Sequence, residues 1–158
     1  TIQSKHEQLQ TYQQDKARLS ALLKTLGTKK FHPHPTSFNF ERSRLPYPLK
    51  NQSKETKPLN QGIVFLAHEG TPVVAALSGK IIFSDWLKGY GLLIIIDHGE
   101  GLLSLYAHNA SLFISQGAFV KQGQQIATVG HTGGLRENGL YFEIRRRGKA
   151  IPPRQWMS

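Results

Sequence analysis

Histidine is the residue type in this chain that is best suited to bind a metal or take part in catalysis, because the sequence contains no cysteine. The glycine-rich half holds four histidines, namely His68, His98, His108 and His131. A hydrolytic zinc site needs three nitrogen or oxygen ligands and an open position where a water is activated. These four histidines form no His-x-His or His-Glu-x-x-His pattern, and the sequence has no Gly-x-Ser-x-Gly elbow, P-loop or dinucleotide fingerprint. Residue types alone therefore predict isolated histidines without an assembled catalytic site.

Length and composition favour one domain with an extension. The chain has 158 residues, of which 39 % are hydrophobic, and its longest apolar run, Leu92–Ile96, is far shorter than the roughly 20 residues of a membrane span. The polar start Thr1–Gln14 has no signal-peptide core, so it does not indicate a compartment. The formal net charge is +10, but the only dense basic cluster, at residues 145–149, has no nucleic-acid-binding motif beside it. We therefore expect no nucleic-acid partner.

Glycine divides the chain into two parts, since Gly27 is the only glycine before Gly62. Six of the eight heptad-spaced positions within Thr1–Leu26 are apolar, namely Ile2, Leu9, Tyr12, Leu19, Leu23 and Leu26. This spacing predicts a helix with one apolar stripe. The helix is either the end of a longer coiled coil or a single helix packed on the domain, and we assign residues 1–30 to such a coiled-coil or regulatory helix.

Prolines dominate the next stretch, residues 31–58, where Pro33, Pro35, Pro46, Pro48 and Pro58 each exclude a helix interior. We interpret this stretch as a linker that becomes an extended groove-edge segment near residues 44–49. Its two histidines, His32 and His34, are expected to be linker residues and not a metal clip.

Residues 59–158 are predicted to form a mainly β, antiparallel domain. Short runs of β-branched, aromatic and aliphatic residues alternate with glycines at spacings near ten residues. The expected strands are Thr71–Leu77, Lys80–Trp86, Leu92–Asp97, Leu102–His108, Ala118–Val120, Gln125–Val129 and Leu140–Arg146.

A series of short motifs in this half resembles the LytM (lysostaphin-type) metallopeptidase domain, which cuts peptidoglycan cross-bridges. The motifs occur in order at residues 62–63, 69–76, 79–81, 89–91, 97–99, 105–108, 120–130 and 140–145. The resemblance implies an antiparallel sheet domain with a duplicated hybrid motif. Residues 86–91 and 140–146, together with a preceding helix, are most similar to the EnvC-type murein hydrolase activators.

The sequence departs from active members of this family at the metal ligands. Matching the family motifs to this chain puts Asn60, Val64 and Tyr141 at the three ligand positions. Valine cannot bind zinc, and asparagine and tyrosine are poor neutral donors. Only His108 matches a catalytic-site histidine. The resemblance therefore implies a degenerate domain with no catalytic residue, no metal and no cofactor.

The remaining groove is expected to bind a protein. Tyr141 and Arg145 share a strand face because alternate residues of a strand point the same way, and tyrosine and arginine are frequent interface anchors. Family geometry places Tyr106 and His108 on a neighbouring wall of the groove, but for Tyr106 we expect ordinary strand packing. The expected partner-binding residues are Gln61, Val64, Tyr90, His108, Tyr141 and Arg145.

By this resemblance, the chain activates a zinc N-acetylmuramoyl-L-alanine amidase in the periplasm of a Gram-negative bacterium. An upstream coiled coil would link it to an FtsEX-type division complex, and peptidoglycan is a further candidate ligand. Two alternatives remain. One is an active zinc endopeptidase with unusual ligands. The other is a carrier module, because residues 117–127 also resemble lipoyl-type barrels, although no lysine at a hairpin tip accompanies them.

Overall fold

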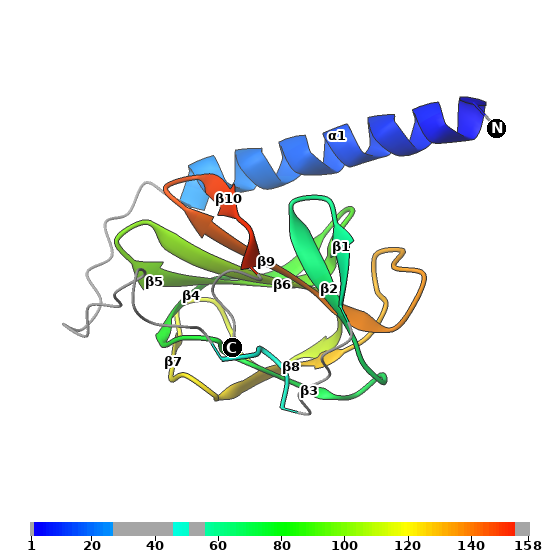
Figure 1. Cartoon of the computed structure of the whole chain (residues 1–158). Helices are drawn as coiled ribbons and strands as arrows, with labels where there is room; N and C mark the ends of the chain where they lie inside the picture. The colour runs from blue at the N-terminus through cyan, green and yellow to red at the C-terminus, as the bar shows by residue number, and fades with distance from the viewer. Residues whose placement is uncertain (1, 27–45, 51–55, 154–158) are drawn as a thin grey trace.

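The computed structural model describes residues 2–26, 46–50 and 56–153, and it places one long helix against a β domain (Figure 1). The elements in chain order are α1 (Ile2–Leu26), β1 (Thr56–Leu59), β2 (Gly62–Leu66), β3 (Pro72–Val74), β4 (Gly79–Leu87), β5 (Gly91–Gly99), β6 (Leu102–Leu112), β7 (Phe119–Val120), β8 (Gln125–Val129), β9 (Gly139–Arg146) and β10 (Lys149–Ile151). The predicted mainly β class with an N-terminal helix is confirmed.

All strand pairs are antiparallel, and the main order is β1-β2-β9-β6-β5-β4-β7. Strand β10 pairs with β9, while β8 pairs with both β3 and β6. Figure 1 shows α1 on one side of the central strands, with β3, β7 and β8 on the opposite side. The central strands β9, β6 and β5 therefore have one face toward the helix and one toward the smaller strands.

Each of the seven strands expected from the sequence is present: β8 has the expected bounds, and the other six have shifted ends. Strand β3 stops at Val74, where a register shift between Val73 and Val74 interrupts its pairing with β8. Strand β6 continues past His108 to Leu112, because β8 pairs with its second half. Strands β1, β2 and β10 were not among the expected strands.

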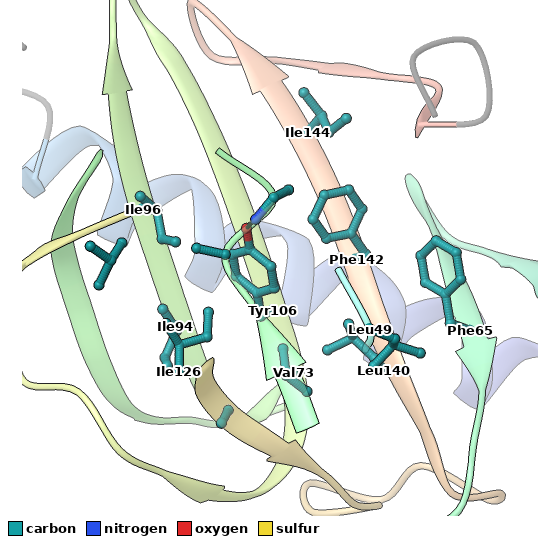
Figure 2. Close-up of a cluster of buried hydrophobic side chains, with 14 of the residues drawn as sticks. Leu49, Phe65, Val73, Ile94, Ile96, Tyr106, Ile126, Leu140, Phe142 and Ile144 are labelled. Atoms are coloured by element: carbon teal, nitrogen blue, oxygen red, sulfur yellow. Dashed lines mark hydrogen bonds between the residues drawn. The ribbon is translucent and has the colours of Figure 1, made fainter. Parts of the chain in front are cut away.

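The main hydrophobic core lies on the face of the central strands that is turned away from α1. Figure 2 shows Tyr106 and Phe142 beside one another, with Ile94 and Ile96 from β5 nearby. The Ala76 N–H donates a 2.9 Å hydrogen bond to the Tyr106 hydroxyl, and burial raises the pKa of Tyr106 to about 12. Tyr106 is thus a core residue, which agrees with the ordinary strand packing expected for it, and it does not lie on the groove wall that family geometry implied.

Helix α1 packs on the other face of the central strands. Its Leu19 side chain is completely buried, and Leu22, Leu23 and Leu26 pack against the same cluster. The residues Glu7–Thr11 are exposed, and that end of α1 extends past the sheet (Figure 1). The apolar stripe predicted for the helix is therefore buried on the domain in its C-terminal half. Among the described segments, no helix combines the length and apolarity needed to cross a membrane.

The short described piece Pro46–Lys50 follows the edge of the domain. Leu49 is buried and forms an isolated β-bridge with Val73, and the Val74 N–H donates to the Pro48 carbonyl. The helix end at residues 27–30, the histidines His32 and His34 and the other linker residues up to 45 lie outside the described residues. The domain boundaries at residues 30 and 58 stay predictions.

Candidate binding face

The sheet face beneath α1 brings together four of the expected groove residues, namely Val64, Tyr90, His108 and Tyr141. We call this face the site face. Val64 and Tyr141 are direct partners across the β2–β9 ladder, and both are buried. The Tyr141 ring lies 6.2 Å from the ring of Tyr90 and 6.1 Å from that of His108. The second hydrophobic cluster of the protein is built around these residues.

Two glycines hold Tyr90 in the β4–β5 turn. Gly89 has φ +91° and Gly91 has φ +66°, a region that residues with a Cβ rarely adopt. Gly91 also packs so tightly on Thr132 that a Cβ would not fit there. Burial raises the pKa of Tyr90, and the nearby Glu143 raises it further, so Tyr90 is a neutral phenol at neutral pH.

His108 has an uncommon backbone conformation, with φ +63°. The backbone N–H of His108 donates a 2.8 Å hydrogen bond to the Tyr90 carbonyl, and the ring Nδ1 donates a 2.6 Å hydrogen bond to the Thr132 carbonyl. Burial lowers the pKa of His108, partly offset by the Thr132 hydrogen bond, so the neutral ring is favoured. With the proton on Nδ1, the lone pair is on Nε2.

Arg145 and Glu143 add a buried ion pair next to Tyr141 on strand β9. Arg145 Nη2 lies 3.4 Å from Glu143 Oε1 and donates a 2.8 Å hydrogen bond to Gln61 Oε1. Burial raises the pKa of Glu143, while the positive charge of Arg145 opposes that shift. Gln61 and Arg145 were expected binding residues, whereas Glu143 was not named as one, although strand alternation places it on the same face.

Asn60 belongs to the turn that precedes β2, the strand that carries Val64. It occupies the exposed β1–β2 turn with φ +52°. Asn60 and Gln61 border an open cavity of about 470 Å³ between this turn and the end of β10, whose walls also include Pro58, Gly62, Ile63, Ala150, Pro152 and Pro153. Of the three positions matched to the family's metal ligands, two form the buried Val64–Tyr141 pair, and the third, Asn60, is exposed at the turn before β2.

The other histidines of the domain do not join His108. His98 Nδ1 donates to the Ser78 carbonyl and its Nε2 is hydrogen-bonded to Ser104 Oγ, whereas His131 pairs with Asn138 in an exposed loop. Within residues 2–26, 46–50 and 56–153, no group of three or more His, Asp or Glu side chains is placed to hold a metal ion.

The donor chemistry of the site face does not fit a zinc ion either. Val64 has no donor atom, and burial, followed by the charge of Glu143, raises the pKa of Tyr141, which keeps the phenol neutral. A neutral phenol is a poor zinc ligand. We therefore derive no reaction step through a metal at this face.

Helix α1 contributes residues to the site face that the sequence did not single out for it. Leu19 belongs to the same cluster as Val64, Tyr90 and Tyr141. The negative charge of Asp15 acts on both Tyr90 and His108. The helical stripe indicated that Leu19 had to be buried, and the structure shows that it is buried against the site face.

Sequence comparison identifies the family of the β domain. Residues 58–153 match the model of Peptidase family M23. The murein hydrolase activator EnvC of Escherichia coli K12 is 48 % identical over 97 residues, which are 61 % of this chain and 23 % of that protein. The murein hydrolase activator NlpD of Salmonella dublin is 40 % identical over 99 residues, 62 % of this chain and 26 % of that protein. The chain thus spans about a quarter of the length of these two relatives.

Structural comparison agrees on the fold. A crystal structure of a putative peptidase M23 from Pseudomonas aeruginosa superposes with a TM-score of 0.71 at 21 % sequence identity, covering 87 % of this chain and 59 % of that one. At this identity the likeness concerns the fold alone. The family match spans most of the β domain and more than half of the chain, and it confirms the resemblance read from the motifs. The chain belongs to peptidase family M23.

Proposed function

We propose that this chain is a non-catalytic activator of peptidoglycan amidases that acts in cell-wall splitting during division, and that it binds the amidase through the site face. The observation that carries the proposal is the composition of this face. The face carries two tyrosines, a valine and a buried arginine, side chains that suit a protein-binding surface. The two curated relatives described above are both named murein hydrolase activators, which supports an activating role for the domain.

The chemistry of the site face suits a protein partner. Tyrosine and arginine contribute large shares of binding energy in many interfaces, especially where water is excluded. Arg145 Nε is buried and has no hydrogen-bond partner among the described residues, so a ligand reaches this donor only if the residues that cover it move. An amphipathic helix in an apolar groove is a common recognition mode, and α1 already uses this mode on the site face.

The position of α1 suggests how binding of the partner is regulated. A partner that uses Tyr90 and Tyr141 meets a surface where Leu19 is now completely buried. We propose that α1 keeps the site face covered until an FtsEX-type division complex, linked through an upstream coiled coil, moves it. The partner shifts this equilibrium only if it prefers the uncovered state.

The proposed compartment is the periplasm of a Gram-negative bacterium. The named relatives come from Escherichia coli and Salmonella and are described as murein hydrolase activators, which supports a location in the cell envelope. Peptidoglycan remains a further candidate ligand of the domain.

A binding and dye-release experiment tests the proposal. The full chain is mixed with purified zinc N-acetylmuramoyl-L-alanine amidases, and release of dye from labelled peptidoglycan is measured with and without the chain. We expect no release by the chain alone, a weak increase in amidase activity when the full chain is added, and a strong increase when a variant with a displaced α1 is added. If the amidases bind neither the full chain nor a variant with a displaced α1, the proposal is rejected.

A further inference from the structure

Thr132 attaches the loop between β8 and β9 to the site face. Its hydroxyl donates a 2.5 Å hydrogen bond to the Asn109 carbonyl and accepts a 3.1 Å hydrogen bond from the Leu92 N–H. Its carbonyl accepts the 2.6 Å hydrogen bond from the ring Nδ1 of His108. One residue therefore joins the loop to strand β5, to strand β6 and to a histidine ring of the site face.

Close backbone packing accompanies these hydrogen bonds. A Cβ on Gly91 would overlap the carbonyl group and the hydroxyl of Thr132. A Cβ on Gly133 would overlap the backbone of Gly91 and crowd that of Tyr90. The loop lies this close to the turn that carries Tyr90 because both positions are glycine.

These contacts surround the two residues that lie beside Tyr141. Tyr90 and His108 are joined by the hydrogen bond from the His108 N–H to the Tyr90 carbonyl, and their rings lie 6.2 and 6.1 Å from the Tyr141 ring. His108 has φ +63°, a conformation that persists in such a residue only where the surroundings hold it. The hydroxyl of Thr132 binds the residue that follows His108, and its carbonyl binds the ring.

We propose that Thr132 is a positioning residue of the site face, whose hydroxyl holds Tyr90 and His108 beside Tyr141 in the arrangement that the partner binds. This inference rests on the proposed function, because it takes these three residues to contact the partner. A surface whose side chains are ordered before association loses less conformational entropy on binding. Thr132 therefore raises the affinity without touching the partner.

A purely structural role of Thr132 has to be separated from positioning. The base of the loop is also closed by other bonds, since the Gly139 N–H donates to the Gly130 carbonyl and His131 Nδ1 donates to Asn138 Oδ1. If Thr132 only stabilised the fold, loss of its hydroxyl would lower the stability and leave the rings and the affinity of the folded chain unchanged.

The test compares variants of the full chain. Thr132→Val keeps the shape of the side chain but lacks the hydroxyl, whereas Thr132→Ser keeps the hydroxyl. Thr71→Val is the matched control, because the Thr71 hydroxyl also donates to a backbone carbonyl, that of His68 at 2.7 Å. Thr71 precedes β3, on the side of the central strands opposite α1 (Figure 1). Urea unfolding gives the stability of each variant, and Thr132→Ala takes the place of Thr132→Val if the latter does not fold.

NMR spectroscopy at neutral pH reports the positioning directly. The NOEs between the ring protons of Tyr141 and those of Tyr90 and His108 should be the same in the wild type, Thr132→Ser and Thr71→Val. In Thr132→Val most of their intensity should be lost, and the ring nitrogen shifts of His108 should show both tautomers instead of the Nδ1–H form. Unchanged signals in Thr132→Val overturn the inference, and so does an equal change in Thr71→Val.

Titration calorimetry with a purified amidase measures the effect on the partner. The variants are combined with Leu19→Ala in the full chain, so that a looser α1 is common to all of them. Thr132→Val should bind about tenfold more weakly than its parent, whereas Thr132→Ser and Thr71→Val should stay within about twofold. Unchanged affinity despite displaced rings overturns the inference.

Failure of the proposed function gives a different result. If no chain binds the amidase, the proposed function is rejected, and the NMR signals alone decide whether Thr132 positions the rings. If the amidase binds normally and the NMR signals of Thr132→Val do not change, the positioning role is rejected and the activator role stays in place.

Discussion

Gln61 and Arg145 are 84 positions apart in the sequence, yet a 2.8 Å hydrogen bond joins their side chains. The bond ties the β1–β2 turn to strand β9, and the same guanidinium neutralises the buried carboxylate of Glu143. Arg145 therefore has two roles: it supports the sheet, and it is a proposed contact for the partner.

The first prediction concerns the structural role of Arg145. Arg145→Ala should lower the free energy of unfolding by about 3 kcal/mol or more, because it leaves the Glu143 carboxylate buried without a counter-charge. The double variant Glu143→Gln/Arg145→Met should recover most of this loss, since it removes both charges and keeps the volume filled. Urea unfolding measures both values. If the double variant is as unstable as the single one, the ion pair is not the cause.

The second prediction concerns the proposed partner contact of Tyr141. Tyr141→Ala should weaken amidase binding by about thirtyfold or more, corresponding to roughly 2 kcal/mol for an interface anchor. Titration calorimetry and dye release measure the effect, with circular dichroism as the check of folding. Lys121→Ala, at an exposed position, is the control and should change little. A Tyr141→Ala chain that binds and activates normally would exclude the site face as the functional surface.

The third prediction concerns metal. The purified chain should contain no stoichiometric zinc and should not digest peptidoglycan by itself, since Val64 and a neutral Tyr141 supply no suitable donor pair. Tyr141→His should not create peptidase activity, because Val64 still faces the new histidine. Metal analysis after mild chelation measures the zinc content. About one zinc per chain would favour the endopeptidase alternative.

The fourth prediction concerns the cover formed by α1. Leu19→Ala should loosen α1 and increase amidase activation, because it removes the completely buried leucine that holds the helix to the site face. Deletion of residues 1–30 should likewise preserve or increase activation. Hydrogen exchange of residues 12–26 reports the loosening. Leu9→Ala is the matched control, because Leu9 is 53 % exposed, and it should behave like the wild type. Loss of activation in a folded truncated chain would contradict this model.

The fifth prediction is a pH dependence of stability. Burial lowers the pKa of His98 from 6.5 to about 4, so between these values the unfolded chain binds more protons than the folded one. The contribution of His98 to stability should thus be complete above pH 6.5 and fall as the pH approaches 4, by up to about 1.4 kcal/mol per pH unit. Urea midpoints at pH 7.5 and pH 4.5 should differ more in the wild type than in His98→Asn. Equal differences in the two proteins would refute the assignment.

The strand pattern was largely predictable, and the exceptions have physical reasons. Glycines mark the ends of the strands between Pro72 and Arg146, so those strands could be predicted from the sequence. Strand β2 is buried at Gly62–Phe65, so it has no alternation of polar and apolar residues to identify it. Strand β10 has three residues, too few for any period to appear.

The site face was predictable only where strands are regular. Alternation along β9 correctly grouped Tyr141 with Arg145, and the structure joins both to the network around Glu143. Alternation fails on β6, because the left-handed conformation of His108 and the neighbouring register shifts turn its ring to the face opposite Tyr106. The burial of Leu19 against the site face depends on how α1 docks, which no local pattern specifies.

Strand β9 divides two tasks between alternate residues. Leu140, Phe142 and Ile144 belong to the main core, whereas Tyr141, Glu143 and Arg145 make up the opposite side. Evolution can therefore change the chemistry of one set while the other keeps the architecture intact. A single family can in this way include members that cut a polymer and members that only recognise a protein, with few substitutions between the two functions.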